Sequence, residues 1–586
     1  MLKRTHKCGE LRLEHAGQEA VLSGWVGNWR DHGGLAFIDL RDRTGITQVV
    51  FRPELDAELH AQARGLRSEY CISVRGRVER RPPEMENSDL PTGQIELLAS
   101  EMELHSKSKT PPFDVQGEEP SIEVRLRHRY LDLRRAAMQR NLEGRHRLTE
   151  ITHRYLDEQG FIGVETPFLA KSTPEGARDY LVPSRVNPGR FYALPQSPQL
   201  FKQMLMMGGL DRYFQVVKCL RDEDVRANRQ PEFTQIDIEM SFVDEQDVME
   251  VAEGLVARFF VELLGRELAR PLPHITYHEA MRKYGTDAPD LRFGLEIGDI
   301  SDIAKECEFR VLRRAVEEGG QVRGICVPGG ADMPRSAVDG LVEWIKQFGP
   351  GGLAWFKIRE GKPEGGVAKF FTEGEINAIR ERLDAQDGSL LLVVADKRYV
   401  CNLALSHLRL RLGREHGLLA GAGDALCWIV QPPAFELAEA SGELTFVHHP
   451  WTAPAAEDIG RLESDPQSVR ARAYDLVMNG QELAGGSIRN SDPDVQMRIL
   501  KLLGYTEEQA EERFGFFLKA LRYGPPPHGG IAFGFDRVVM TFLGLEDIRE
   551  TIAFPKTQRA VCLLTGAPSE VDEEQLRELD IRIGWE

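Results

Sequence analysis

The chain has 586 residues, of which 41% are hydrophobic and 28% charged, and its formal net charge is −18. Because a domain takes roughly 100–200 residues, we expect several domains. This composition excludes a collagen, a disordered chain and a membrane bundle. The apolar run 390–395 has six residues, against the roughly 18 that a membrane-spanning helix needs.

The N-terminus and the cysteines indicate a cytoplasmic protein. The first fifteen residues, MLKRTHKCGELRLEH, lack the apolar segment of a secretory signal. The eight cysteines form no CxxC pair or ligand-like cluster. We therefore expect reduced, mostly packed thiols and no membrane attachment.

Residues 1–106 read as short strands separated by turns, with one helical stretch at 54–69. Five strands with a helix between the third and fourth are the order of an OB-fold β-barrel, which binds single-stranded nucleic acid. In the second strand, Ala36, Ile38 and Leu40 share one face and are expected to point inward, which leaves Phe37 outside as a stacking platform or a half-buried surface ring. The expected strands are 21–26, 35–42, 46–51, 71–78 and 94–99.

A Pro- and charge-rich segment opens residues 107–140, which we interpret as a linker or hinge. Between Arg125 and Arg147 there are eight arginines against Asp132 and Glu143, a local excess of 8 − 2 = +6. This excess predicts either a solvated basic face or an electrostatic footprint for nucleic acid inside an acidic protein.

Mixed α and β patterns fill the rest of the chain. A helix at 141–159 and a strand at 161–166 begin it, and residues 141–294 and 416–586 are expected to form the two parts of one domain. The glycine-rich texture of residues 295–415 indicates an inserted α/β domain. The fold class is therefore multi-domain α+β, with an N-terminal barrel.

Four segments are unusually dense in polar residues. Each alone would more often be a turn or a salt-bridged surface. In the third, Asp237 and Glu239 alternate along a strand and would project from the same face. The segments are STPEGARD at 172–179, QSPQLFK at 196–202, RDEDVR through RQPEFTQ to IDIE at 221–239, and GIAFGFDR at 530–537.

The order of these segments resembles class II aminoacyl-tRNA synthetases. A strand ending at Pro167 precedes an Arg-x-Glu with a basic loop and a return strand, and a Gly-rich turn then closes on Arg537. The barrel narrows the likeness to the enzymes for Asp, Asn and Lys. The phrases TPEGARDYLVPSR, QSPQLFKQ, RDED, RQPEFTQID and FGFDR are similar to the bacterial aspartyl-tRNA synthetase family, over nearly the whole chain.

The resemblance implies ATP-dependent ligation of L-aspartate to tRNA through aspartyl-adenylate. Such chemistry needs positioning and charge neutralisation more than a protein nucleophile. By the match, Arg221 and Arg537 are catalytic and contact the α- and γ-phosphates, and Phe233 stacks on adenine. The implied ATP site comprises Arg221, Asp222, Glu223, Gln230, Phe233, Glu482, Gly534, Phe535, Asp536 and Arg537.

Two further sets follow from the resemblance. Asp475 and Glu482 match carboxylates that hold Mg²⁺ against the phosphates. Lys202 and Arg489 match a cationic pair for the substrate side-chain carboxylate, which would reject the neutral amide of asparagine. The implied aspartate site comprises Glu175, Gln199, Lys202, Arg221, Asp237, His448 and Arg489.

For tRNA, the resemblance assigns anticodon reading to Phe37, Gln48 and Glu96 in the barrel. The arginine-rich stretch then becomes a hinge along the tRNA backbone. His32, in the Arg-Asp-His-Gly-Gly loop, matches relatives that charge both tRNA(Asp) and tRNA(Asn). Residues 82–84 read Pro-Pro-Glu and do not match the glycine expected there.

Several alternatives stay open at this point. The alternative on specificity is an enzyme strictly for tRNA(Asp). Others are an asparagine enzyme, a synthetase-like RNA-binding protein without catalysis, and an aminoacyl-AMP ligase that does not use tRNA. Class II resemblance also implies a homodimer.

Overall fold

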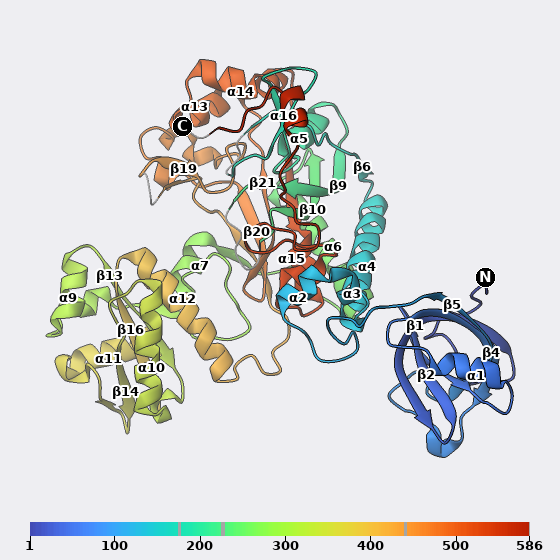
Figure 1. Cartoon of the computed structure of the whole chain (residues 1–586). Helices are drawn as coiled ribbons and strands as arrows, with labels where there is room; N and C mark the ends of the chain where they lie inside the picture. Colours follow the sequence, from blue (N-terminus) through green and yellow to red (C-terminus); the bar gives the residue numbers. More distant parts are fainter. Residues whose placement is uncertain (174–176, 224–228, 439–441, 585–586) are drawn as a thin grey trace. The chain divides into compact units, whose positions relative to one another are not determined.

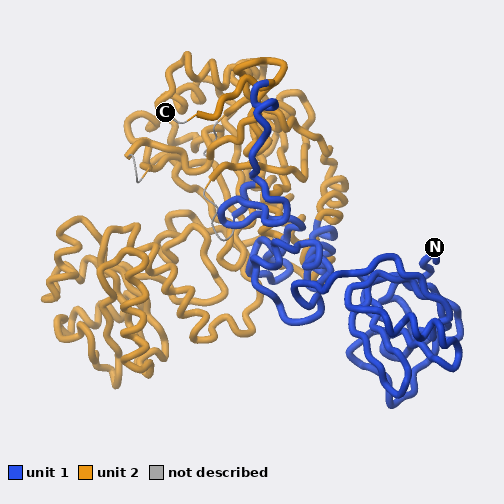
Figure 2. The backbone as a smooth tube through the Cα atoms, in the orientation of Figure 1, with its two compact units in different colours: residues 1–148, 224–231, 539–577 blue, residues 149–223, 232–538, 578–586 orange. Residues whose placement is uncertain are grey.

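The structure is a computed structural model, and it describes residues 1–173, 177–223, 229–438 and 442–584. The chain divides into two compact units (Figure 2). Unit 1 comprises residues 1–148, 224–231 and 539–577, and unit 2 comprises residues 149–223, 232–538 and 578–586. None of the helices in the described ranges is long and apolar enough to span a bilayer. All eight cysteines are free thiols, as predicted.

Unit 1 begins with the predicted five-stranded barrel, which is closed in the order β1-β2-β3-β5-β4. Helix α1 (Ala57–Arg64) lies between the third and fourth strands and is shorter than predicted, because the Asp56 side chain caps its start and Gly65 ends it. The strands are β1 (Glu19–His32), β2 (Leu35–Asp42), β3 (Gly45–Phe51), β4 (Cys71–Arg80) and β5 (Ile95–Ser106).

Inward-pointing apolar side chains, alternating with outward-pointing ones along the strands, fill the barrel core, as predicted. Ala36, Ile38 and Leu40 are fully buried, while Phe37 between them is only partly buried. Because successive strand side chains point to opposite faces, Phe37 lies on the outer face of β2.

The remainder of unit 1 is more helical than the predicted linker. Residues 122–140 form two short helices and the start of a long one, which begins at Ala136 rather than at 141. These helices are α2 (Ile122–Arg127), α3 (Arg129–Asp132) and α4 (Ala136–Glu158), and α16 (Glu573–Glu578) lies near the C-terminus.

The centre of unit 2 is an eight-stranded sheet in the order β11-β17-β20-β21-β22-β10-β9-β6. Its strands are antiparallel except at the two edges, where β11 pairs with β17 and β6 with β9 in parallel. The predicted strand at 161–166 is only the two-residue edge strand β6 (Ile162–Gly163). The other strands are β9 (Arg212–Leu220), β10 (Glu232–Ser241), β11 (His274–Thr276), β17 (Leu426–Val430), β20 (Ala473–Met478), β21 (Gln481–Ile488) and β22 (His528–Gly534).

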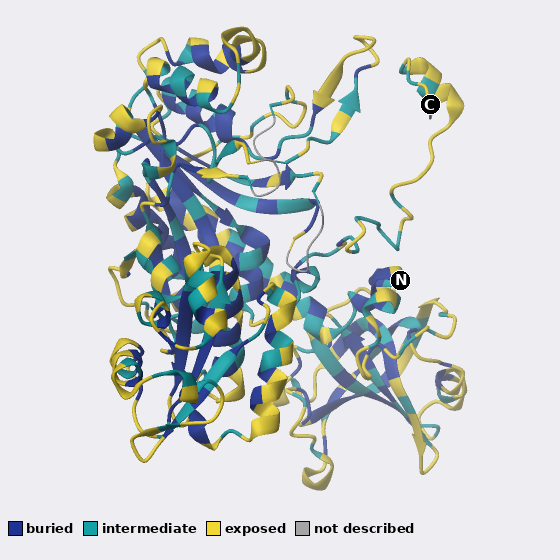
Figure 3. Ribbon diagram, turned by 90° about the vertical axis from the view of Figure 1, so that its left-hand side faces the viewer, coloured by how far each residue is buried: buried dark blue, intermediate teal, exposed yellow. Residues whose placement is uncertain are grey.

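Helices and short hairpins accompany this sheet, and most of its central strands are buried along their length (Figure 3). Two-stranded hairpins are formed by β7 (Leu181–Pro183) with β8 (Phe191–Ala193) and by β18 (Phe435–Leu437) with β19 (Leu444–Phe446). The helices are α5 (Gln199–Met207), α6 (Glu245–Leu264), α7 (Tyr277–Lys283), α13 (Pro493–Leu502), α14 (Glu507–Ala520) and α15 (Phe535–Phe542).

Residues 297–415 form a second sheet with its own core, in the order β12-β13-β16-β14-β15. The apolar run noted in the sequence is β16 (Leu390–Asp396), which is buried on both faces: Leu390 and Leu392 pack in one cluster, Leu391 and Val393 in the other. The remaining elements are β12 (Ile297–Asp299), α8 (Ser301–Ala304), α9 (Arg310–Glu317), β13 (Gln321–Val327), α10 (Arg335–Ile345), β14 (Ala354–Arg359), β15 (Lys362–Glu364), α11 (Glu373–Arg382) and α12 (Arg398–Glu415).

Candidate active site

The candidate active site of unit 2 is built on strand β10, which lies between β9 and β22. Asp237 and Glu239 are two residues apart on this strand and share a face, as the alternation predicted. Both are buried, with relative exposures of 1% and 0%. Directly across from Glu239 on β22 is Gly530, where a Cβ atom would lie 2.0 Å from Glu239 Oε2. Glycine therefore makes the room for this carboxylate.

The predicted cationic pair lies against these two carboxylates. Lys202 on α5 places its Nζ 2.6 Å from Asp237 Oδ1 and 3.3 Å from Glu239 Oε2. Arg489, which follows β21, donates from Nε and Nη2 to the two oxygens of Glu239 at 2.8 and 2.9 Å. All four side chains are buried. Lys202 and Arg489 thus belong to one cluster, joined by Glu239.

The charges within this cluster affect its two acids differently. Burial would raise the pKa of Glu239, but Arg489 and Lys202 outweigh it and hold the pKa at about 2. Burial raises the pKa of Asp237 to about 6, against the attraction of Lys202. Glu239 therefore stays ionised at neutral pH, whereas Asp237 titrates just below it.

Several buried polar atoms of unit 2 have no hydrogen-bond partner among the described residues. They include Gln199 Nε2, Arg221 Nε, Asp237 Oδ2 and Asp475 Oδ1. All four belong to the residues predicted to bind aspartate, ATP or Mg²⁺. Because a buried polar group without a partner is costly, these atoms fit a site whose ligand supplies the missing partners.

Arg221 and Phe233 are brought together by the pairing of β9 and β10. Phe233 lies opposite Cys219 in the ladder, and Arg221 follows the end of β9. The Arg221 guanidinium lies over the Phe233 ring, 5.0 Å from its centroid. A cation beside an aromatic platform suits a phosphate attached to a flat base.

Arg537 lies at the end of the same sheet, in the first turn of α15. Its Nη1 donates to the main-chain oxygen of Glu482 at 2.5 Å and lies 3.5 Å from Glu482 Oε2. Asp536 is buried and accepts from the Thr234 backbone N–H at 2.7 Å. Gly534 ends β22 and Phe535 begins the helix. Asp536 thus ties the start of α15 to β10.

Asp475 and Glu482 project from the β20–β21 hairpin. Asp475 lies opposite Gly485, where a Cβ atom would be 2.7 Å from Asp475 Oδ1 and 3.4 Å from Glu482 Oε1. Burial, Glu482 and Asp287 raise the pKa of Asp475 well above its usual value. Two crowded carboxylates with an unpartnered oxygen fit a divalent cation. No group of three metal-binding side chains occurs within the described residues, so substrate oxygens or water would complete its coordination.

The two histidines before Pro450 have different neighbours. His448 Nε2 lies 3.9 Å from Asp475 Oδ2, and burial lowers the pKa of His448 to about 4. The histidine within hydrogen-bond distance of Arg489 is His449, whose Nε2 is 2.8 Å from Arg489 Nη1. The sequence prediction had singled out His448 alone.

Four predicted residues are not placed in this cluster by the structure. Glu175 lies outside the described residues. Asp222 follows β9, where its backbone N–H donates to the oxygen of Arg178, and Glu223 is the last residue of this stretch of unit 2. Gln230 belongs to unit 1, where its side-chain amide pairs with the backbone of Lys556 through bonds of 2.8 and 3.1 Å.

The barrel carries its predicted readers on the outside of β1, β2, β3 and β5. Gln48 donates to Glu96 at 3.0 Å and receives a bond of 3.4 Å from Arg30. Phe37 lies across from Arg30 in the strand pairing. His32 is exposed and ends β1, before the glycines at 33 and 34, whose φ angles of 61° and 84° make a tight hairpin turn.

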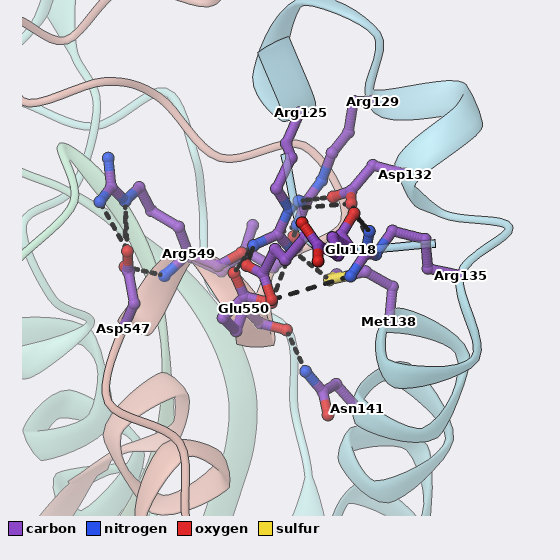
Figure 4. A network of polar contacts seen from close by, with 12 residues as sticks. Glu118, Arg125, Arg129, Asp132, Arg135, Met138, Asn141, Asp547, Arg549 and Glu550 are labelled. Carbon is purple, nitrogen blue, oxygen red and sulfur yellow. Dashed lines mark hydrogen bonds and ion pairs between the residues drawn. The ribbon is translucent and has the colours of Figure 1, made fainter. Parts of the chain in front are cut away.

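Two arginines of the arginine-rich stretch are buried, so the prediction that the stretch lies along RNA does not hold for these two. Arg125 and Arg129 are 3% and 1% exposed and both bind Asp132, at 2.9 and 2.5 Å. Arg125 also binds Glu550, as Figure 4 shows, and Arg129 donates to three backbone oxygens of residues 549–553. These two arginines therefore stabilise the fold instead of presenting charge to a ligand.

Arg134 is likewise engaged within unit 1. It binds Glu69 at 2.7 Å, on the carboxylate that also binds Arg41 at 2.7 Å. Its guanidinium also lies 4.6 Å from the centroid of the Trp25 ring. Arg127, Arg140 and Arg147 are exposed. The arginines of this stretch therefore fall into a structural set, paired within unit 1, and an exposed set. The local charge count did not separate the two sets.

Comparisons with known proteins agree with this geometry. Residues 121–558 match the family described as tRNA synthetases class II (D, K and N), and residues 20–104 match the OB-fold nucleic acid binding domain. An aspartate–tRNA(Asp/Asn) ligase of Caldanaerobacter subterraneus is 52% identical over 99% of this chain and 98% of its own length. An aspartate–tRNA ligase of Clostridium perfringens is 52% identical over 99% of this chain and 97% of its own.

Solved structures share the fold at low identity. An asparaginyl-tRNA synthetase from Pyrococcus horikoshii superposes with a TM-score of 0.59 at 19% identity, covering 95% of this chain and 99% of its own. An aspartyl-tRNA synthetase from Entamoeba histolytica gives 0.58 at 18% identity, covering 94% and 91%. The chain belongs to the class II aminoacyl-tRNA synthetases of the D, K and N group, and within it to the bacterial aspartate–tRNA ligases.

Proposed function

We propose that the protein activates L-aspartate with ATP and transfers the aspartyl group to tRNA. The observation that carries this proposal is the buried cluster in which Lys202 and Arg489 share the carboxylate of Glu239. Two cations held in one place suit a ligand whose side chain ends in a carboxylate. The family supplies the use of ATP.

In the first step, an oxygen of the aspartate α-carboxylate attacks the α-phosphorus of ATP and pyrophosphate leaves. Arg221 neutralises charge on the α-phosphate, Phe233 stacks on adenine, and Arg537 binds the far end of the triphosphate. A guanidinium suits this task because it is planar and permanently charged. By the family match, Glu223 and the start of α15 complete the nucleotide site.

Asp475 and Glu482 would hold Mg²⁺, which would neutralise the phosphate oxygens. In the second step, a terminal ribose hydroxyl of tRNA attacks the aspartyl carbonyl carbon. The bond to the adenylate phosphate breaks and AMP leaves. Asp237, through the oxygen that has no partner among the described residues, accepts the substrate ammonium and fixes the amino acid for both steps.

Selection of aspartate over asparagine follows from the fixed charge. Asparagine has nearly the same shape but presents a neutral amide, whose NH₂ group would face the donors of Lys202 and Arg489. A site built for a charged partner rejects an analogue that leaves its buried groups unpaired. Glu175 and Gln199 belong to this site by the family match, together with His448.

The barrel reads the anticodon through Phe37, Gln48 and Glu96. Both tRNA(Asp) and tRNA(Asn) are substrates in this proposal, because His32 at the exposed hairpin matches relatives that accept both. Several 52%-identical relatives carry the name aspartate–tRNA(Asp/Asn) ligase. The glycine expected near residues 82–84 is absent, and the strictly tRNA(Asp)-specific enzyme is the alternative.

We also propose a homodimer, with the barrel at 1–106, a hinge at 107–140, a catalytic domain at 141–294 and 416–586, and an inserted domain at 295–415. The test is to charge purified tRNA(Asp) and tRNA(Asn) transcripts separately, alongside pyrophosphate exchange with aspartate and with asparagine. We expect exchange with aspartate only and charging of both transcripts. Exchange driven by asparagine would overturn the reaction, while failure on tRNA(Asn) alone would overturn only the broad specificity.

A further inference from the structure

Three residues of the central sheet lie in one row across neighbouring strands. Glu239 on β10 lies opposite Gly530 on β22, and Gly530 lies opposite Ser487 on β21. Side chains directly opposite one another point to the same face of a sheet. Because Gly530 has no side chain, the row leaves a gap between Glu239 and Ser487, whose strands are about 9–10 Å apart.

The guanidinium of Arg489 spans this gap and is bonded at both ends. At one end, Nε and Nη2 donate to the carboxylate of Glu239 at 2.8 and 2.9 Å. At the other end, Nη1 donates to Ser487 Oγ at 2.6 Å. Arg489 directly follows β21, so Ser487, two residues earlier, shares its face. The register of the sheet therefore places Ser487 at the end of the guanidinium that Glu239 does not reach.

A guanidinium has five N–H donors in one plane, and Arg489 uses four of them within the protein. Two go to Glu239 and one to Ser487, and the second N–H of Nη1 donates to His449 Nε2 at 2.8 Å. These are the hydrogen bonds of Arg489 among the described residues, so one N–H of Nη2 remains. Its direction is fixed, because the plane is held at all three nitrogens.

The oxygen of Ser487 is itself held in place. Ser487 is 1% exposed, and its Oγ also accepts from the hydroxyl of Thr452 at 3.1 Å. A hydroxyl oxygen has two lone pairs, so Arg489 and Thr452 together use both. Thr452 is fully buried, and its backbone pairs with that of Arg489. Ser487 is thus a fixed acceptor for the guanidinium.

We propose that Ser487 is a positioning residue, which sets the plane of the Arg489 guanidinium so that the remaining N–H of Nη2 meets the side-chain carboxylate of the substrate. This inference rests on the proposed function. Lys202 has three N–H donors, of which Asp237 and Glu239 take two, so it contributes one as well. Without Ser487, the guanidinium stays bound to Glu239 but can turn about that contact.

Two matched variants separate this role from support of the fold. Ser487→Ala removes the oxygen that binds Arg489. Thr452→Val removes the neighbouring hydroxyl and leaves the bond between Ser487 and Arg489 intact. Each variant takes one buried hydroxyl from the same chain of hydrogen bonds, so both should lower the thermal unfolding midpoint by a similar amount. Only Ser487→Ala should change the binding of aspartate.

The readout is pyrophosphate exchange by the full-length protein, with separate KM values for aspartate and for ATP. We expect Ser487→Ala to raise the KM for aspartate by about tenfold, the value of one hydrogen bond to a charged group. Thr452→Val should stay within about twofold of wild type. Ser487→Cys keeps the shape but offers a weaker acceptor, so its KM for aspartate should lie between those of Ser487→Ala and wild type. The KM for ATP should not change.

The proposal is overturned if Ser487→Ala keeps the wild-type KM for aspartate, if Thr452→Val raises that KM as much, or if the KM values for aspartate and ATP rise together. Ser487→Cys with a higher KM for aspartate than Ser487→Ala would also overturn it, because packing would then decide the effect. The wild-type protein tests the underlying function separately. If it shows no aspartate-dependent exchange, the proposed function fails, whatever the variants do.

Discussion

Two regions of the molecule bury arginine–carboxylate networks, and they differ in what they leave unpaired. In unit 1, Arg125, Arg129, Asp132 and Glu550 bind one another and the backbone, and none of their buried polar atoms lacks a partner among the described residues. In unit 2, the cluster of Lys202, Asp237, Glu239 and Arg489 leaves Asp237 Oδ2 without one. Burial of charge is common to both.

The difference separates a structural network from a binding site. A closed network has used its hydrogen-bonding capacity, so removing one member leaves its partners buried and unpaired. An open network keeps hydrogen-bonding atoms free for a ligand. Arg221 Nε and Asp475 Oδ1 are also buried without a partner among the described residues. Unit 1 should therefore respond to mutation in stability, and unit 2 in catalysis.

The largest effect is expected from Arg489→Leu, which removes a cation from the open cluster. We expect kcat/KM for aspartate in pyrophosphate exchange to fall by about 10⁴-fold, because the substrate carboxylate loses its fixed partner. Arg489→Lys, which keeps the charge but loses the bidentate bond to Glu239, should fall less. Binding of ATP alone, measured by calorimetry, is the control. Unchanged aspartate kinetics in Arg489→Leu would contradict the assignment.

Asp132→Asn tests the closed network. It takes a charge from a carboxylate that binds Arg125 and Arg129, and loss of one partner in a buried ion network costs about 3–5 kcal/mol of unfolding free energy. Urea unfolding with the matched change at the exposed Glu143 measures this. The KM for aspartate of the folded protein should equal that of wild type. A change in that KM without a loss of stability would contradict the separation of the two networks.

The raised pKa of Asp237 gives the open cluster a pH dependence. Folding raises this pKa from 3.8 to about 6, so the protein loses stability as the pH rises from about 3.8 to about 6 and no further above that. Protonating Asp237 below pH 6 removes the partner of the substrate ammonium. The kcat/KM for aspartate should thus fall about tenfold for each pH unit below 6. The substrate's own side chain, with a pKa near about 3.9, does not titrate there. A flat profile from pH 5 to 7 would contradict this role.

The smallest effect is expected from Glu143→Gln. Glu143 pairs with Arg43 at 3.3 Å, and the two side chains are 47% and 56% exposed. Water screens such a pair, so the unfolding free energy should change by less than about 0.5 kcal/mol. Urea unfolding beside Asp132→Asn gives the contrast directly. A loss comparable to that of Asp132→Asn would show that exposure does not decide the value of these pairs.

The sequence predicted the barrel well, because each of its strands alternates and each turn has its own signal. It also placed Asp237 and Glu239 on one face, since a strand has a period of two residues. The residues of the cationic pair were named from a family likeness, and the structure brings them to one carboxylate. The edge strand β6 was predicted too long, because its pairing with β9 ends after two residues.

Other features depend on partners that are remote in the chain. The burial of Arg125 rests on Glu550, 425 residues away, so a local charge count mistook it for a surface. The side chain of Gln230, which was predicted to bind ATP, likewise pairs with a remote partner, the backbone of Lys556, 326 residues away. The sequence could not show that His449 rather than His448 contacts Arg489, because the His-His-Pro sequence contains no signal for ring orientation.

The glycine opposite Glu239 ties two positions of the chain together. A methyl group at Gly530 would overlap both Glu239 Oε2 and the backbone oxygen of Ile238. A substitution at Gly530 or at Glu239 therefore affects the other position. Shortening the acid alone would open a void beneath the cations, and enlarging the glycine alone would push the acid out. Substitutions at positions 239 and 530 are therefore expected to occur together in evolution. A homologue that has changed only one of them is expected to have a differently shaped amino-acid pocket.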